Sequence, residues 1–248
     1  MELDQYERIY GSLNSVRDVP TLSQRYGVSE ELLTAVLTQK IVRDTKRRYY
    51  DVKRISLGLL DKWCSGMSFM EIAGDLNFPP VLTASIILHQ KGVSPSQFRK
   101  FVKDVESVEG SRLKEELREA LKNDIVYSPE GNMMQASRGR MVEEEVKKWL
   151  ESKQIGFMRE AESRKHHPKT PDFLLEKKLT INDREYNWIE CKASFGDKIE
   201  VKKDHKKQFQ HYVELFGSGI VIYWYGFTEE NPSEDVQLES QTLINRTG

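Results

Sequence analysis

The stretch TPDFLLEKKLTINDREYNWIECKAS, residues 170–194, decides the fold of the second half of the chain. Its first part, residues 170–179, and its last part, residues 184–194, each have the length and the apolar content of a β-strand. The four residues between them, 180–183, read TIND and are typical of a turn. The stretch therefore predicts an antiparallel β-hairpin.

Alternate side chains of a strand point to the same face, which sorts the residues of the second strand. Trp188, Glu190 and Lys192 are expected on one face. Ile189 and Cys191 are expected on the other face, where small and apolar side chains suit a buried position. The first face thus combines two opposite charges with a tryptophan, and it is either a solvated strand face or a binding site.

The register of the hairpin determines what lies beside these charges. Asp172 stands at the start of the first strand. A three-residue loop at 180–182 would place Asp172 opposite Glu190, whereas a two-residue turn at 182–183 would place it opposite Ala193. The sequence leaves both registers open, but the two carboxylates are near neighbours in either one.

Two carboxylates at close range repel each other unless a positive charge lies between them. A hard divalent cation meets this need, because Mg²⁺ takes oxygen ligands and usually one or two protein carboxylates. Lys192 would then lie beside the cation and could offset negative charge on a phosphate. Asp172, Glu190 and Lys192 together are a plausible site for phosphodiester hydrolysis with Mg²⁺ or Mn²⁺.

The pattern around the hairpin indicates an α/β domain. Residues 137–157 have an amphipathic helical pattern, residues 205–217 form a second helical segment that ends at Gly217, and residues 219–227 have the composition of a strand. The order is helix, strand, strand, helix, strand. We therefore expect a mixed central sheet.

The first half of the chain is predicted to be all helical. Residues 22–42 contain a helix, a break at Gly27 and a second helix with Ser29 as its N-cap, and residues 68–94 repeat this helix-turn-helix pattern. The expected domains are a tandem helix-turn-helix domain at 1–125, a linker at 126–137 punctuated by Pro129 and Gly131, and the α/β domain at 138–248.

Composition limits the class of protein and its location. The 248 residues are 38% hydrophobic and 31% charged, with a net charge of −1 and only two cysteines. These features predict neither a disulfide framework nor a membrane span, and the acidic N-terminus does not resemble a signal peptide. The expected location is the cytoplasm or nucleoid of a prokaryote, or the nucleus of a eukaryote.

Nucleic-acid binding would have to come from local basic clusters. Residues 40–54 hold seven basic and two acidic side chains, with Tyr49 and Tyr50 available for stacking on bases. A second, lysine-rich cluster follows the hairpin. The alternative for both clusters is a solvated helix face. The residues predicted to contact phosphate are Lys40, Arg43, Lys46, Arg47, Arg48, Lys202, Lys203 and Lys206.

The words TPDFLL and WIECKASFGD resemble the Pro-Asp…(Asp/Glu)-x-Lys nuclease superfamily. More narrowly, KTPDF, WIECKASFGD, the Gln208–Phe209 pair and FGSGIVIYWYGF resemble the TPD-motif family. These matches run in one order over residues 139–227. The resemblance implies a restriction-endonuclease-like core behind N-terminal helical DNA-binding modules, similar to archaeal Holliday-junction resolvases.

The resemblance also implies roles for individual residues. Asp172 and Glu190 match the metal-binding carboxylates, Cys191 would contribute its backbone carbonyl to the metal, and Lys192 matches the catalytic lysine. An additional metal-binding glutamate is expected from the first core helix, and of Glu143, Glu144 and Glu145, Glu143 fits best, whereas the other two are expected to be solvated charges. Gln208 matches a glutamine that helps orient the site, with a surface helix residue as the alternative.

The expected function is therefore a metal-dependent endonuclease that hydrolyses DNA, with selectivity for junctions or branches. Two alternatives stay open. One is a nucleic-acid-binding or scaffold protein with an idle or weak nuclease core, and the other is a nuclease that acts on RNA. Junction-resolving relatives act as symmetric dimers, so a homodimer is expected, and a protein partner is a further expectation.

Overall fold

The computed structural model describes residues 1–164, 167, 169–228 and 231–246. The chain divides into two compact units, which are described separately. Unit 1 comprises residues 1–37 and 137–248, and unit 2 comprises residues 38–136. Two long helices, α3 (Glu30–Arg54) and α9 (Pro129–Ser152), each have residues in both units.

Unit 1 contains one five-stranded sheet in the order β1-β2-β3-β4-β5. The β1–β2 and β2–β3 pairs are antiparallel, and the β3–β4 and β4–β5 pairs are parallel. This arrangement confirms the predicted mixed sheet, in which β1 and β5 are additional strands that the sequence analysis did not find. The strands are β1 (Phe157–Arg159), β2 (Phe173–Ile181), β3 (Arg184–Lys192), β4 (Gly219–Tyr223) and β5 (Val236–Glu239).

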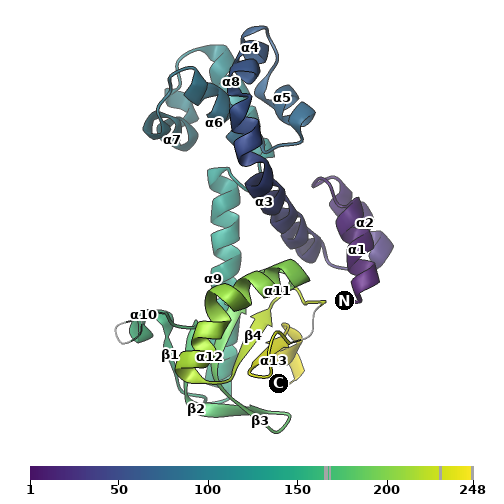
Figure 1. The fold of residues 1–248 in the computed structure, drawn as a ribbon, viewed down its shortest axis with the longest axis vertical. Helices are drawn as coiled ribbons and strands as arrows, with labels where there is room; N and C mark the ends of the chain where they lie inside the picture. Colours follow the sequence, from purple (N-terminus) through teal and green to yellow (C-terminus); the bar gives the residue numbers. More distant parts are fainter. Residues whose placement is uncertain (165–166, 168, 229–230, 247–248) are drawn as a thin grey trace. The chain divides into compact units, whose positions relative to one another are not determined.

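Helices cover both faces of this sheet (Figure 1). One face packs against the C-terminal part of α9 through Val146, Trp149 and Leu150, and against α13 (Thr242–Arg246). The other face packs against the helical segment that crosses from β3 to β4. That segment consists of α11 (Lys198–Asp204), the π-helical turn η2 (His205–Phe209) and α12 (Gln210–Phe216).

The two predicted faces of β3 are confirmed by these cores. Ile189 lies in the core beneath α9, and Cys191 packs against that core. Trp188 lies in the opposite core with Phe209 and Tyr212. Gly219 on β4 permits this packing, because a Cβ at Gly219 would lie 2.0 Å from the indole ring of Trp188.

The β2–β3 hairpin combines features of both registers that the sequence left open. Its turn has two residues, Asn182 and Asp183, whose φ angles of 49° and 61° suit a left-handed hairpin turn. Ile181 pairs with Arg184 beside this turn, but the register shifts between Leu174 and Leu179. Beyond that bulge Phe173 pairs with Ile189, which brings Asp172 next to Glu190. This is the neighbour that a three-residue loop would have given to Asp172.

Strand β4 is shorter than the sequence predicted. It ends at Tyr223, and the amide of Gly226 donates to the Tyr223 carbonyl to close a turn. The apolar run to Phe227 therefore contains a strand and a turn. Gly226 has a φ of 91°, which an L-residue with a side chain rarely adopts.

The N-terminal helices α1 (Leu3–Ser12) and α2 (Asp18–Tyr26) belong to unit 1. Tyr6 stacks on Phe195, with ring centroids 5.0 Å apart, and its hydroxyl donates to the carboxylate of Asp197. These contacts tie α1 to the segment that follows β3. The structural division thus differs from the predicted helical domain at 1–125, because helix periodicity does not reveal which surface a helix packs on.

Unit 2 is helical and has its own core. Trp63 stacks on Phe69 at this core, and its indole N–H donates to Glu116 over 2.7 Å. No described helix in either unit has the length and apolar character required to span a membrane. The shorter helices of unit 2 are α4 (Ser56–Cys64), α5 (Phe69–Leu76), α6 (Pro80–Gln90), α7 (Pro95–Lys103), the 3₁₀ turn η1 (Val105–Ser107) and α8 (Ser111–Asn123).

Both predicted helix–turn–helix segments contain two helices joined by a left-handed residue. Gly27, with φ 64°, separates α2 from α3, and Ser29 caps α3 by accepting from the Leu32 amide. Asn77, with φ 44°, separates α5 from α6. The first pair starts in unit 1 and the second lies in unit 2. Their role in DNA binding stays a prediction.

The predicted linker at 126–137 is corrected by helix α9, which starts at Pro129. Proline suits the first turn of a helix, where its missing N–H has no intrahelical partner. Ser128 adds a cap, because its hydroxyl accepts from the Gly131 amide over 2.9 Å. Proline and glycine therefore mark the start of a helix here, and residues 129–137 are helical.

Candidate active site

Asp172 and Glu190 lie next to each other at the end of the β2–β3 pair. The Asp172 amide donates to Oε2 of Glu190 over 3.3 Å, and the Cys191 amide donates to Oδ2 of Asp172 over 2.7 Å. Glu190 is only 4% exposed. This burial rules out the solvated-face alternative for Glu190, and the β-bulge is what brings Asp172 to it.

Lys192 and Gln208 complete a hydrogen-bonded row with Glu190. The ammonium of Lys192 donates to Oε1 of Glu190 over 2.7 Å and to Oε1 of Gln208 over 2.6 Å. Lys192 is 17% exposed in its side chain. Gln208 comes from the π-helical turn η2, a type of irregularity that often occurs at functional sites. The structure therefore places Gln208 at the site.

Burial controls the charge states of this row. Burial raises the pKa of Asp172, and the charge of Glu190 adds to the effect, bringing the pKa to about 8. Burial also raises the pKa of Glu190, more than Lys192 lowers it. For Lys192, burial lowers the pKa, but the charges of Glu190 and Asp204 outweigh burial and raise it overall. Lys192 is therefore an ammonium ion at neutral pH.

Cys191 has a buried thiol that is unsuited to nucleophilic attack. Burial raises its pKa, and the nearby charges of Asp172 and Glu190 raise it further. A thiol needs positive surroundings to become a reactive thiolate, and these surroundings are negative. What Cys191 contributes to the site is its backbone, whose amide holds the Asp172 carboxylate.

The three consecutive glutamates of α9 differ in their surroundings. Glu144 pairs with Lys147 at 3.4 Å and Glu145 pairs with Lys148 at 2.8 Å, both on the exposed surface of the helix. Glu143 instead pairs with Arg159 at 2.8 Å. Its charge is one of the causes of the raised pKa of Asp172, after burial and Glu190. Of the three glutamates, only Glu143 therefore acts on the site.

The carboxylate oxygens at this site suit a hard cation, although they are too few to surround it completely. Asp172 and Glu190 supply carboxylate oxygens, and Oδ1 of Asp172 accepts no hydrogen bond from any described residue. Within the described part of the chain, no three His, Cys, Asp or Glu side chains form a ready metal-binding group. Two carboxylates fit Mg²⁺ or Mn²⁺, which usually retain waters and substrate oxygens as ligands.

Two residues at this site were missed by sequence reasoning. Asp204 is 8% exposed, accepts from the Tyr223 hydroxyl over 3.0 Å, and contributes to the raised pKa of Lys192. Arg159 ends β1 and holds Glu143. The spacing of Asp204 from Gln208 along one helix could have indicated its position, whereas β1 is too short to give a periodic signal.

Comparison with known proteins places this hairpin in a family. The family described as "Protein of unknown function TPD sequence-motif" matches residues 109–246, which is more than half of the chain. The chain belongs to this TPD family. The match includes Thr170, Pro171 and Asp172, together with the whole of the hairpin.

Several vertebrate proteins are similar to this TPD-family chain, and each is named CDAN1-interacting nuclease 1. The mouse protein is 28% identical and the human protein 27% identical, each match covering 91% of this chain and 88% of the relative. The chicken protein is 31% identical over 65% of this chain and 58% of its own length. No solved structure gives a significant match.

The basic residues predicted to contact nucleic acid have varied surroundings in the TPD-family chain. On α3, Lys46 and Arg47 are exposed, and Arg47 pairs with Asp44 at 2.8 Å. Arg48 instead donates to the carbonyl oxygens of Leu76 and Asn77 at the end of α5, which is a structural role. Lys40 and Arg43 are half-buried.

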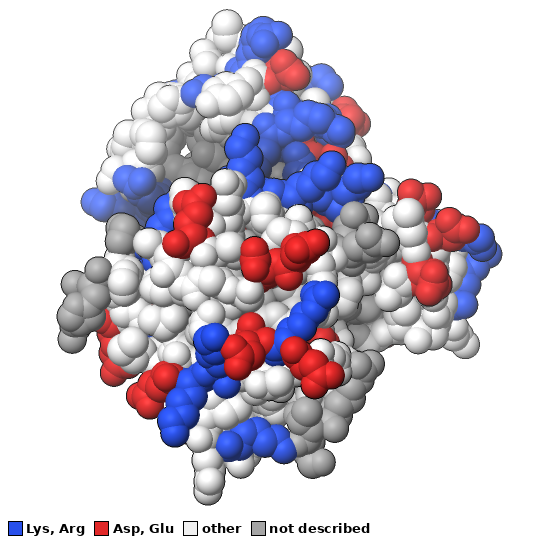
Figure 2. All heavy atoms as spheres, turned by 60° about the horizontal axis from the view of Figure 1, so that its bottom comes forward, with Lys and Arg blue, Asp and Glu red and all other residues white. Residues whose placement is uncertain are grey.

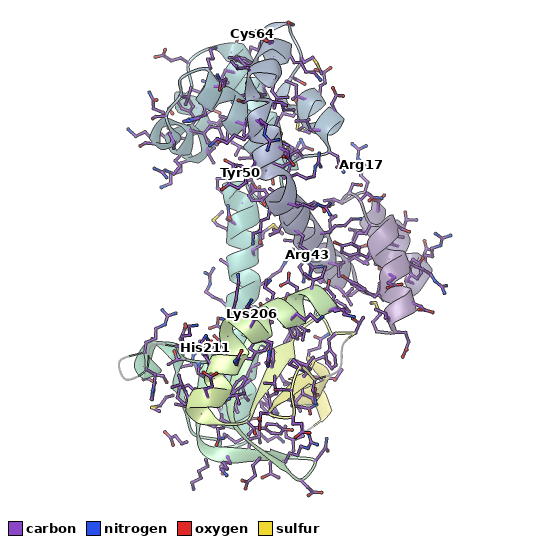
Figure 3. The ribbon with its side chains drawn as sticks, viewed as in Figure 1. Arg17, Arg43, Tyr50, Cys64, Lys206 and His211 are labelled. Carbon is purple, nitrogen blue, oxygen red and sulfur yellow. The ribbon has the colours of Figure 1, made fainter. Side chains whose placement is uncertain are left out.

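The aromatic pair beside these residues is divided by the fold. Tyr49 packs against the core of unit 2, whereas Tyr50 is 74% exposed on α3 (Figure 3). Tyr50 is therefore the one of the two that could stack on a base.

The lysine cluster of unit 1 lies on the helical segment after β3. Lys202 and Lys206 are exposed, and Lys206 projects from η2, the turn that also carries Gln208 (Figure 3). Lys203 forms ion pairs with Glu200 and Asp204. Figure 2 shows basic and acidic side chains next to each other over much of the face it presents, in keeping with a net charge of −1. Phosphate contacts by these residues stay a prediction.

Proposed function

We propose that this protein is a divalent-cation-dependent nuclease that hydrolyses phosphodiester bonds in DNA. The observation that carries the proposal is the row formed by Asp172, Glu190, Lys192 and Gln208. In this row, Glu190 accepts from both the Asp172 amide and the part-buried ammonium of Lys192. The nuclease name of the similar vertebrate proteins supports the same chemistry.

The carboxylates would hold the cation. Asp172 and Glu190 are the main ligands in this proposal, and the carbonyl of Cys191 and the carboxylate of Glu143 are additional ones. A bound Mg²⁺ or Mn²⁺ supplies Lewis-acid chemistry, since it lowers the pKa of water and offsets negative charge on a phosphate. Burial raises the pKa of both carboxylates, and the charge of Glu190 adds to the effect on Asp172. A cation between them would favour their ionised forms and so suits this role.

Lys192 would provide a fixed positive charge for the phosphate that is being cleaved. Its raised pKa keeps the amine protonated at neutral pH, so it acts as a charge and hydrogen-bond donor and not as a general base. Gln208 and Glu190 hold this ammonium from two sides. A preorganised charge of this kind stabilises the transition state without having to reorient during the reaction.

The resemblance to Pro-Asp…(Asp/Glu)-x-Lys nucleases suggests a superfamily, a substrate, an oligomeric state and a location for this protein. We place the protein in that superfamily and propose branched or junction DNA as its substrate, bound by a homodimer in the nucleoid of a prokaryote or the nucleus of a eukaryote. The similar vertebrate proteins are named for an interaction with CDAN1. By analogy, we propose a protein partner for this chain as well.

Cleavage of labelled nucleic acids in Mg²⁺ or Mn²⁺ tests this function. We expect wild-type protein to cut at least one of duplex, forked and four-way-junction DNA. Asp172→Asn should lower the rate about a hundredfold or more, because it removes a cation ligand and its charge. Glu185→Gln is the matched control, because Glu185 is an exposed carboxylate of the same hairpin.

Equal cleavage by wild type and Asp172→Asn would mean that a contaminant is responsible and would refute the assignment. Matched RNA versions of the same substrates decide between the two nucleic acids. Faster cleavage of RNA would replace DNA as the proposed substrate while leaving the site intact.

Two observations favour the alternative of a scaffold with an idle core. Glu190 already forms an ion pair with Lys192, so its charge is balanced without a cation. In addition, no group of three metal-binding side chains occurs among the described residues. A scaffold of this kind would bind nucleic acid without binding Mg²⁺ or Mn²⁺ at millimolar concentration. Metal titration therefore separates it from the proposed nuclease.

A further inference from the structure

Arg159 forms a bridge between helix α9 and the strand that carries the site. Its guanidinium donates to Oε2 of Glu143 over 2.8 Å. It also lies over the ring of Phe173, 4.8 Å from the ring centroid. Phe173 directly follows Asp172 and is the strand partner of Arg159 in the β1–β2 pair. Arg159 therefore holds Glu143 at the edge of the Asp172–Glu190 site.

Glu143 is a third carboxylate whose charge acts on Asp172. It projects from α9 next to the buried Val142, and its charge acts on both Asp172 and Cys191. The third carboxylate is thus present, but it is paired with an arginine. This pairing is one reason why the ready ligands at the site are Asp172 and Glu190.

We propose that Arg159 is a positioning residue that controls whether Glu143 can bind the cation, because the guanidinium and the cation compete for the same carboxylate. This inference rests on the proposed function, since it assumes that Asp172 and Glu190 hold a divalent cation. Arg159 itself lies outside the family motif. In the absence of a cation, Arg159 limits the repulsion among three neighbouring carboxylates.

The strength of the Arg159–Glu143 pair suits such an exchange. The two side chains are 33% and 34% exposed, and ion pairs with this much solvent contact are weak. A divalent cation held by two further carboxylates can overcome that attraction. Arg159 also remains anchored after release, because its guanidinium lies on Phe173 and its amide donates to Glu162.

Calorimetric titration with Mn²⁺ alone tests the exchange without any activity measurement. Arg159→Gln should bind Mn²⁺ about two- to fivefold more tightly than wild type, because Glu143 no longer has a competing partner. The same change in a Glu143→Gln background should give no gain. Arg159→Lys retains a cation that can pair with Glu143, so its affinity should stay close to that of wild type.

Lys147→Gln is the matched control. Lys147 pairs with Glu144 at 3.4 Å on the same helix as Glu143, and its side chain is 34% exposed, close to the 33% of Arg159. Its removal deletes one positive charge of that helix without releasing Glu143. We expect its Mn²⁺ affinity to change by less than about 1.5-fold.

Unchanged or weaker Mn²⁺ binding by Arg159→Gln would overturn the inference, while wild-type binding would leave the proposed function standing. A gain that persists in the Glu143→Gln background would also overturn it, because loss of a positive charge would then be the whole cause. If Arg159→Gln does not fold, Arg159→Met tests the same gain in Mn²⁺ affinity, because it removes the charge and retains an unbranched side chain that can lie over Phe173. Weaker binding by Glu143→Gln is expected, and equal binding would remove Glu143 from the site. A wild type that binds no Mn²⁺ would overturn both the proposed function and this inference.

Discussion

Replacement of Lys192 by alanine is expected to lower the rate of DNA cleavage about a hundredfold or more, with DNA affinity within about twofold of wild type. The loss follows from the position of the ammonium, which Glu190 and Gln208 hold in place at 2.7 and 2.6 Å. A single preorganised donor of this kind typically contributes a factor of about 10² to 10³ in turnover. Single-turnover cleavage and a binding assay in Ca²⁺ measure the two quantities separately.

Two further variants make the Lys192 result specific. Lys192→Ala leaves the carboxylate of Glu190 buried without its ammonium partner, so the less disruptive Lys192→Gln should be measured beside it. Lys192→Gln retains a hydrogen-bond donor but no charge, and it should also lose cleavage. Lys178→Ala removes an exposed lysine of the same hairpin and should retain wild-type turnover. Cleavage at the wild-type rate in both Lys192 variants would exclude this lysine from the chemistry.

Asp172→Asn is expected to stabilise the protein at pH 8 in metal-free buffer. The pKa of Asp172 is about 8 in the folded protein, because burial and Glu190 disfavour its charge, and it lies near 3.8 in the unfolded chain. Between these values the folded state binds the additional proton, so the free energy of unfolding falls as pH rises from about 4 to 8. Asparagine can still accept from the Cys191 amide but has no charge to bury.

Thermal unfolding in EDTA at several pH values measures this effect. At pH 8 we expect a gain of up to about 5 kcal/mol, or up to about 10–20 °C in the unfolding midpoint of unit 1. At pH 4 the variant and wild type should have similar midpoints, since Asp172 is then protonated in the folded state. Glu185→Gln, at an exposed carboxylate, should show no such pH dependence. A variant less stable than wild type at pH 8 would contradict the raised pKa.

Much of the site could be predicted from the sequence because strand periodicity is a local property. The alternation of Trp188, Glu190 and Lys192 on β3 needs only a strand, and the structure contains that strand with the predicted faces. The amphipathic part of α9 was also predictable, since Val146 and Leu150 repeat with helical spacing. Local patterns of this type do not depend on distant parts of the chain.

The hairpin register could not be predicted, because a bulge leaves no periodic signal. Four residues of β2, 175–178, lie between the paired positions Leu174 and Leu179, whereas only Asn187 lies between their partners on β3. Two residues of the turn and this irregularity together determine the place of Asp172. Turn length alone allows two registers. The structure has the two-residue turn of one register and, beyond the bulge, the strand pairing of the other.

Long-range packing explains the other differences. The attachment of α1 to unit 1 depends on Tyr6 meeting Phe195 and Asp197, and these residues are far apart in the sequence. Arg48 similarly lay in a basic run, but the end of α5 provides carbonyl oxygens for it. Arg159 comes to Glu143 through a three-residue strand. Each case depends on a partner that composition and spacing do not identify.

Calorimetric titration of wild type and Asp172→Asn with Mn²⁺ at pH 7.5 tests the central claim most directly, namely that two neighbouring carboxylates form a cation site. The account predicts that wild type binds Mn²⁺ at or below about millimolar concentration and that Asp172→Asn binds at least about tenfold more weakly. Absence of Mn²⁺ binding by wild type, or equal binding by both proteins, would contradict the account.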